Sequence, residues 1–235
     1  MQTMEEKKNK QTENIEKLIE SPEALQDTLG TAEKFAEKNK NLIMAAMAGF
    51  AVFVLAVFGY VKFQDSKNME GQEVLSPSVF FLEKGEYQKA LEGDGNSKGF
   101  VRIADEFSGT AAANLASYYA GVAYLNTGEF DQAIAYLEDF SSNDLLVQAR
   151  AFALLGDAYV EKENYEKAAS YFEKAASYKE NKAFAPTYLY KKALAEEAAG
   201  NANAAVETYQ EIASDYETSQ EAIEAKKSIA RLSVK

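Results

Sequence analysis

The feature of this sequence that most constrains its fold is a residue pattern that recurs after 35 residues. The two copies begin at Ser117 and Phe152 and read SYYAGVAYLNTGEFDQAIAYLEDF and FALLGDAYVEKENYEKAASYFEKA. In the second half of each copy, apolar residues recur at positions i, i+3, i+4 and i+7, the spacing of one buried helical face. They are Phe130, Ala133, Ile134 and Leu137, and then Tyr165, Ala168, Ala169 and Phe172. This period predicts helical hairpins stacked into an array.

Each copy also carries a glycine where its two helices must nearly touch. Gly121 and Gly156 occupy the same place in the pattern, and the large residues Leu137 and Phe172 fill a turn of the second helix. Because alternating small and large residues let antiparallel helices interlock, we interpret the glycines as a packing requirement.

A third copy begins at Leu189, 37 residues after the second. Ala193 stands at the glycine position and Gly200 lies in the turn. Lys192 and Glu196 depart from the pattern, because the earlier copies have apolar residues or tyrosine there. We therefore expect the first helix of this copy to be rotated or less deeply packed.

The segments beside these copies complete the predicted array. A degenerate first copy is expected to begin near Ser78, and residues 219–235 have the apolar side of a capping helix. The glycine-rich segment 92–110 lacks the Gly-Lys-Ser or Gly-Lys-Thr of a phosphate loop, and Lys98 occupies a ligand position of a calcium loop. We expect this segment to be an exposed loop.

The repeated pattern resembles the tetratricopeptide repeat, a helix-turn-helix unit of about 34 residues. The resemblance implies an all-α fold in which a tetratricopeptide-repeat α-solenoid occupies residues 78–235. It also implies a concave partner-binding groove lined by the first helix of each repeat, with Ala153, Val160, Thr187 and Leu194 among its positions. The principal groove positions are Leu115, Tyr118, Val122, Leu125, Asn126, Arg150, Asp157, Glu161, Tyr190 and Glu197. Packing of these tyrosines inside the array is the alternative.

Residues 42–61 form a run of 20 uncharged, largely apolar residues. A helix of that length spans about 30 Å, the thickness of a bilayer's hydrocarbon core. The 41 residues before it argue against a cleaved signal peptide, so we predict a single transmembrane signal anchor in contact with the lipid bilayer. Within the span, Ala45 and Gly49 form a small-xxx-small pair suited to docking another helix, with packing against lipid alone as the alternative.

Lysine counts on the two sides of the span favour a cytoplasmic helical tail at residues 1–41. Residues 62–77 are then expected to be a linker on the opposite side of the membrane, before the repeats. A solvated arm is the alternative interpretation of the tail.

Composition excludes several kinds of chemistry. Cysteine and histidine are absent, so thiolate nucleophiles, disulfides and histidine-based catalytic or zinc sites are excluded. The net charge of −12 argues against nucleic acid as a partner. The carboxylate pairs Asp105 and Glu106, Glu138 and Asp139, and Asp157 and Glu161 are best explained as solvated charge. We therefore predict no catalytic residue, no cofactor, no metal and no enzyme activity.

Taken together, the tail, the signal anchor and the acidic repeats resemble the YfgM-like family of ancillary SecYEG translocon subunits. The resemblance implies a single-pass protein of the bacterial inner membrane, with its N-terminus in the cytoplasm and its repeats in the periplasm. Its partners would be the translocon, a chaperone or exported clients. A structural scaffold or adaptor subunit of an envelope complex, without client binding, is the alternative. The sequence sets no oligomeric state.

Overall fold

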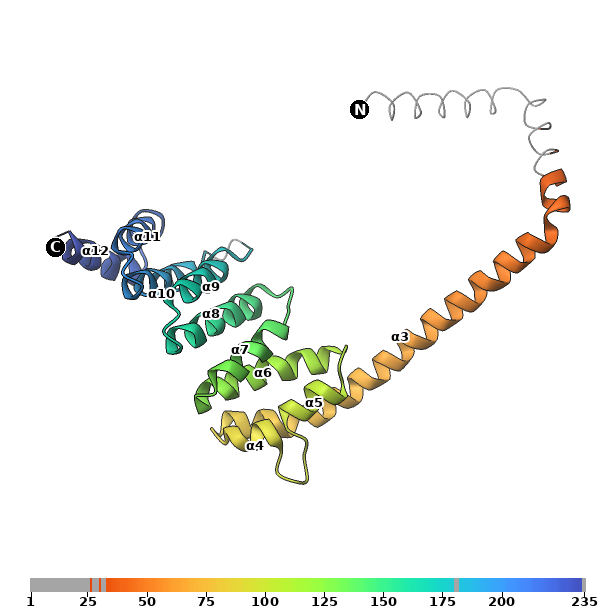
Figure 1. The fold of residues 1–235 in the computed structure, drawn as a ribbon, viewed down its shortest axis with the longest axis horizontal. Coiled ribbons are helices and arrows are strands. Elements are labelled where there is room, and N and C mark those ends of the chain that lie inside the picture. The colour runs from red at the N-terminus through yellow and green to blue at the C-terminus, as the bar shows by residue number, and fades with distance from the viewer. Residues whose placement is uncertain (1–25, 27–29, 31–32, 180–181, 234–235) are drawn as a thin grey trace. The chain divides into compact units, whose positions relative to one another are not determined.

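The structure is a computed structural model that describes residues 26, 30, 33–179 and 182–233. The chain divides into two compact units, residues 1–62 and 63–235, which are described separately. The helices, labelled as in Figure 1, are α3 (Lys40–Glu83), α4 (Tyr87–Glu92), α5 (Phe100–Glu106), α6 (Ala111–Thr127), α7 (Phe130–Asp139), α8 (Leu145–Glu161), α9 (Tyr165–Ser177), α10 (Ala185–Ala198), α11 (Ala202–Asp215) and α12 (Gln220–Leu232).

In the first unit, residues 33–38 are helical and α3 begins at Lys40. Among the described residues, α3 is the one helix that is long and apolar enough to cross a membrane. Within the described residues, the large side chains of its apolar segment are exposed: Leu42 is 70% exposed and Phe50 68% exposed. The predicted tail falls largely outside the described residues.

The second unit begins within α3, where the expected linker is instead helical and packed. Gly71 and Leu75 are buried, and the Asn68 side-chain oxygen accepts a hydrogen bond of 2.9 Å from the backbone N–H of Ala112. A methyl group placed at Gly71 would lie 2.7 Å from the Cβ of Ala112. The linker expectation is corrected: the last turns of α3 belong to the array.

The glycine-rich segment is only partly the exposed loop that was expected. Asp94 accepts hydrogen bonds from the backbone N–H groups of Asn96 and Ser97, which closes a turn. Residues 100–106, however, form α5, whose Phe100 and Ile103 are fully buried. The loop expectation is therefore wrong for these residues, because their apolar side chains share one helical face.

Three consecutive hairpins follow, α6 with α7, α8 with α9, and α10 with α11, referred to below as the first, second and third repeats (Figure 1). Side-chain caps begin several of the helices: Thr110, Asp144 and Asn164 accept hydrogen bonds from backbone N–H groups of the first turns of α6, α8 and α9. The turns share a left-handed backbone position, occupied by Gly128 (φ 80°), Glu163 (φ 57°) and Gly200 (φ 80°).

The predicted close approach of the two helices is confirmed in the first and second repeats. A methyl group at Gly121 would lie 2.5 Å from the Cγ of Leu137, and one at Gly156 would lie 2.5 Å from the Cε1 of Phe172. Since buried carbon atoms do not approach so closely, only glycine fits without movement of these side chains.

The expectation that α10 packs less deeply is confirmed where the sequence departs from the pattern but not at the crossing of the two helices. Lys192 and Glu196 are only partly buried, whereas the corresponding Leu155 and Tyr159 of α8 are buried. Leu189 is 2% exposed and Ala193 is fully buried, at the place that corresponds to Gly156. The predicted capping helix is α12, whose Ala222 and Ala225 are fully buried in the same cluster as Tyr209. The array is thus closed at its C-terminal end by an amphipathic helix.

Candidate protein-binding groove

A cavity of about 210 Å³ opens between α8, α9 and α10, where the second repeat meets the third. We call it the α8–α10 pocket. Its walls are mainly apolar: Val160, Tyr165, Phe172, Leu194, Ala195 and Ala198. Leu194 is 45% exposed although it is a large apolar residue. The pocket therefore offers an unfilled apolar surface between the first helices of two consecutive repeats.

The rim of the pocket carries one ion pair. The Lys191 ammonium donates to the two carboxylate oxygens of Asp157 at 2.8 and 2.9 Å, and both side chains are 39% exposed. The same ammonium lies 5.5 Å from the centre of the Phe172 ring. At this exposure the pair contributes roughly 0.2–1 kcal/mol to stability. Its main effect is to join α8 to α10 and to cancel two charges beside the pocket.

One face of α8 carries a row of four residues toward this groove. Arg150, Leu154, Asp157 and Glu161 recur at the spacing of a single helical face. Arg150 and Glu161 are exposed, and no ion pair joins either of them to another residue in the described part of the chain. The row is therefore positive near the start of α8, neutral in the middle and negative at its end.

Arg150 lies near tyrosines of both neighbouring first helices. Burial raises the pKa of Tyr118 in α6 and of Tyr188 in α10, and the positive charge of Arg150 partly offsets that rise. The guanidinium is therefore on the face formed by α6, α8 and α10, which is the face that the sequence assigned to partner binding.

The structure brings some of the predicted groove residues together and separates others. Asp157, Val160 and Leu194 meet at the α8–α10 pocket. Tyr118 is only 8% exposed, because it packs edge-on against Tyr119 and beside Phe140. Leu115, Val122 and Leu125 are partly buried against the same core cluster.

The remaining predicted positions are occupied by contacts within the array or stand free at the surface. Tyr190 packs against Tyr209 with ring centres 5.6 Å apart. Glu197 accepts hydrogen bonds from the Tyr209 hydroxyl at 2.7 Å and from Arg231 of α12 at 2.8 Å. Asn126 is exposed and donates to the carbonyl of Val122.

Sequence reasoning missed Lys191, Tyr165, Phe172, Ala195 and Ala198 as pocket residues. A signal for Lys191 was present: it follows Asp157 by 34 residues, one repeat length, as Arg231 follows Glu197. Opposite charges at the repeat period place an ion pair between neighbouring first helices.

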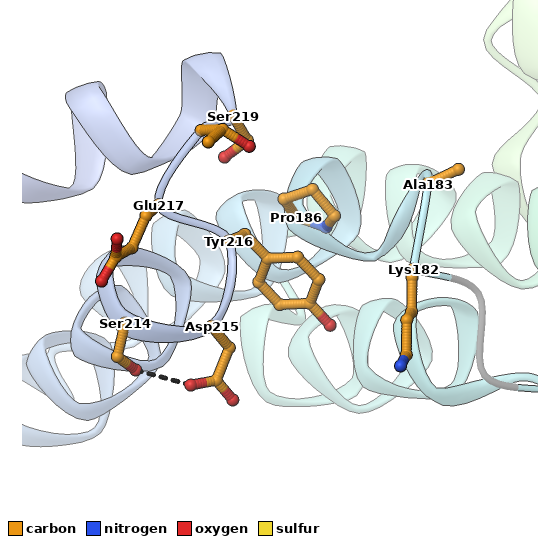
Figure 2. A pocket seen from close by; sticks show the side chains of 9 residues that line it. Lys182, Ala183, Pro186, Ser214, Asp215, Tyr216, Glu217 and Ser219 are labelled. Carbon is orange, nitrogen blue, oxygen red and sulfur yellow. Dashed lines mark hydrogen bonds between the residues drawn. The ribbon is translucent and has the colours of Figure 1, made fainter.

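A second cavity, of about 470 Å³, lies beside the turn between α11 and α12 (Figure 2). Tyr216 stands at its centre, with Lys182 and Pro186 on one side and Asp215 on the other. Its lining is mainly polar, and the Ser219 hydroxyl already caps α12. It therefore lacks the apolar floor of the α8–α10 pocket.

The carboxylates considered as catalytic candidates are held in ion pairs or lie at the surface. Glu106 accepts from Lys98 and from Arg102, and these hydrogen bonds hold its pKa below the usual value. Asp157 is paired with Lys191, as described above. In the part of the chain that the structure describes, no group of three or more acidic side chains is placed to hold a metal ion.

Comparison with known proteins agrees with this architecture. Residues 118–186 and 154–222 match the model of the tetratricopeptide repeat family. These residues are tetratricopeptide repeats. The repeats imply a protein–protein interaction module, and this fold is typically a non-enzymatic scaffold.

Solved structures show the same fold. The nearly identical TPR-like repeats of a protein named as a kinesin light chain in Podosopora anserina superpose with a TM-score of 0.52 at 14% identity, covering 68% of this chain and 84% of that one. A single-substitution variant of those repeats gives the same values. At this identity the likeness concerns the fold alone. No curated protein sequence matched the chain.

Proposed function

We propose that this protein is a membrane-anchored interaction module that holds another polypeptide in the groove around the α8–α10 pocket. The observation that carries the proposal is the unfilled apolar cavity between the first helices of two tetratricopeptide repeats, with Leu194 exposed at its wall. An exposed apolar surface of this kind is a site for a partner's side chains.

The anchor in this proposal is the apolar segment of α3. Its side chains are exposed, and a bilayer would remove them from water. Nothing lies within 4 Å of a methyl group placed at Gly49, so the face that carries Ala45 and Gly49 is open to another transmembrane helix. This face would dock beside a membrane partner such as the Sec translocon.

The proposed location follows from the anchor and the lysine distribution. The protein would lie in a bacterial inner membrane, with residues 1–41 in the cytoplasm and the repeats in the periplasm. There the groove would meet exported clients or a partner chaperone. Protease added to the outside of spheroplasts is expected to digest the repeats, and protection of the repeats would overturn this orientation.

Site-specific photocrosslinking tests the proposed function. A photoreactive residue at Leu194 of the full-length protein in its native membrane should capture translocon subunits, a chaperone or exported chains. The matched control carries the same group at Gln132, an exposed position on α7 that does not line the pocket. Equal capture from the two positions, or none from Leu194, would contradict the proposal.

A structural adaptor is the second candidate, and the internal ion pairs favour it. Asp157 and Glu197, two of the charged groove positions, are bound to Lys191 and Arg231 of the array itself. Purification in mild detergent separates the candidates. An adaptor gives one stoichiometric assembly, whereas a client-binding protein gives many exported chains in low amounts.

A further inference from the structure

We propose that the α8–α10 pocket and its charged row select an extended peptide segment in which one large apolar side chain stands between an acidic and a basic residue. This inference rests on the proposed function, because it specifies the segment that the groove holds. Three properties of the described residues carry it: the volume of the pocket, the charges along α8 and the distances between them.

The pocket volume sets the size of the central side chain. A cavity of roughly 150 Å³ is enough to bind benzene. The α8–α10 pocket has about 210 Å³ and is walled by Val160, Phe172 and Leu194. One leucine, methionine or phenylalanine side chain fits this space. The segment therefore inserts a single apolar residue.

The charges along α8 set the flanking residues. The Asp157 carboxylate is neutralised by Lys191, so the charges left for a partner are those of Arg150 and Glu161. An acidic group on the segment complements Arg150, and a basic group complements Glu161. A segment with two acidic ends meets Glu161 unfavourably, and one with two basic ends meets Arg150 unfavourably.

Helix geometry sets the spacing between these groups. On α8 the pocket is lined by Asp157 and Val160, so its centre lies eight or nine residues after Arg150 and two or three before Glu161, which corresponds to roughly 13 Å and 4 Å along the helix. An extended chain advances about 3.3 Å per residue. The acidic residue therefore lies about four positions from the apolar residue, and the basic residue about one position from it on the other side.

Labelled peptides and a charge-exchange variant test this specificity. The matching peptide contains Glu-Ser-Ser-Ser-Leu-Lys with blocked ends, and the mismatched peptide contains Lys-Ser-Ser-Ser-Leu-Glu. The unequal spacing keeps the two distinct in whichever direction they bind. Fluorescence anisotropy with the full-length protein in detergent should show about fivefold tighter binding of the matching peptide. Replacing its leucine by serine should weaken binding at least about tenfold.

The variant that carries both Arg150→Glu and Glu161→Arg should reverse this preference. Both side chains are exposed, so the fold should be retained, and an unchanged melting temperature verifies this. Equal affinity of the wild type for the two peptides, or an unchanged preference in the variant, overturns the inference.

These outcomes are distinguishable from failure of the proposed function. Crosslinking from Leu194 to cellular proteins without any peptide preference leaves the proposed function standing and removes the inference. A peptide preference without cellular crosslinking removes the proposed function and leaves the peptide specificity of the pocket standing.

Discussion

The second and third repeats solve the same packing problem with different chemistry. In the second repeat, Tyr159 of the first helix stacks on Tyr171 of the second helix, with ring centres 5.4 Å apart and planes 12° apart. At the corresponding positions of the third repeat, the Thr208 hydroxyl donates a 2.8 Å hydrogen bond to the Glu196 carboxylate. The spacing in the sequence is 12 residues in both cases. An aromatic stack and a polar pair thus occupy equivalent places between the two helices.

The polar pair of the third repeat belongs to a partly buried ionic network. Lys192 pairs with Glu173 of α9 and approaches Glu196 at 3.9 Å, and the side chains of Lys192 and Glu196 are 20% and 12% exposed. Burial lowers the pKa of Lys192, but the hydrogen bond and charge of Glu173, together with the charges of Glu196 and Glu211, more than offset this effect and raise the pKa. The comparison teaches that the hairpin geometry tolerates either solution as long as a small residue, Gly156 or Ala193, remains at the crossing.

The largest expected effect concerns the large residue that faces the crossing. Phe172 is 1% exposed, and the corresponding Tyr209 of the third repeat is fully buried. Phe172→Ala should lower the free energy of unfolding by about 3–5 kcal/mol, because it opens a cavity in the core. Chemical denaturation of the full-length protein in detergent, followed by circular dichroism, measures the loss. In Tyr209→Phe the ring stays and only the hydrogen bonds of the hydroxyl with Glu197 and Ser228 are lost, so about 1–2 kcal/mol is expected. Equal losses would break the comparison.

The next largest effect is expected at the point where the two helices of a repeat cross. There the sign of the change in stability tests how closely the helices approach. In an ordinary helix, Gly→Ala stabilises by about 1 kcal/mol. Gly156→Ala should instead destabilise by about 1–3 kcal/mol, since the added methyl would lie 2.5 Å from the buried Phe172 ring. Ala193→Gly is the matched control and should cost only about 1 kcal/mol, from helix propensity. A stabilised Gly156→Ala variant would mean that the two helices are less close than the geometry indicates.

This difference in tolerance also explains what the sequence reveals about the fold. The hairpins were predictable because their apolar residues follow a helical period and Gly121 and Gly156 recur with it. The packing of the last turns of α3 was not predictable from the sequence. Their buried residues Gly71, Leu75 and Ser78 share one helical face, but only Leu75 is a large apolar residue, so the face gives no hydrophobic pattern. The close packing of α10 at Ala193 was not predicted, because the sequence does not show that Lys192 pairs with Glu173 and that Glu196 accepts a hydrogen bond from Thr208.

The candidate site was predictable only where no neighbouring helix covers it. Asp157 and Leu194 meet at the pocket because the first helices of consecutive repeats lie side by side. Tyr118 is covered by Phe140, and Glu197 is bound by Arg231 of the capping helix. The sequence of a repeat shows which face of its first helix points toward the groove. Whether a residue on that face is exposed depends on side chains about one repeat away in the sequence.

An effect of similar size distinguishes the aromatic pair of the second repeat from the polar pair of the third. Thr208→Val removes the hydrogen bond to Glu196 and leaves a carboxylate that is 12% exposed without that donor. A loss of about 1.5–3 kcal/mol is expected, as for hydrogen bonds to charged groups. Tyr171→Phe also removes one hydrogen bond, but its acceptor Glu138 is exposed and keeps contact with water. That loss should stay near 0.5 kcal/mol, and thermal unfolding of the two variants measures the difference. Matching losses would show that burial of Glu196 has no energetic consequence.

The smallest effect is a pH dependence created by the ionic network of the third repeat. Burial raises the pKa of Glu211, the charges of Glu173, Asp215 and Glu196 add to the rise, and Lys192 opposes it. A folded-state pKa above the unfolded value means that the folded protein binds the proton more tightly, so ionisation of Glu211 reduces stability as pH rises through that range. Glu211→Gln should therefore raise the melting temperature at pH 7, and the gain should disappear toward pH 4, where the wild-type carboxyl is itself protonated. A gain for Glu211→Gln that stays constant with pH would assign the effect to packing and not to charge.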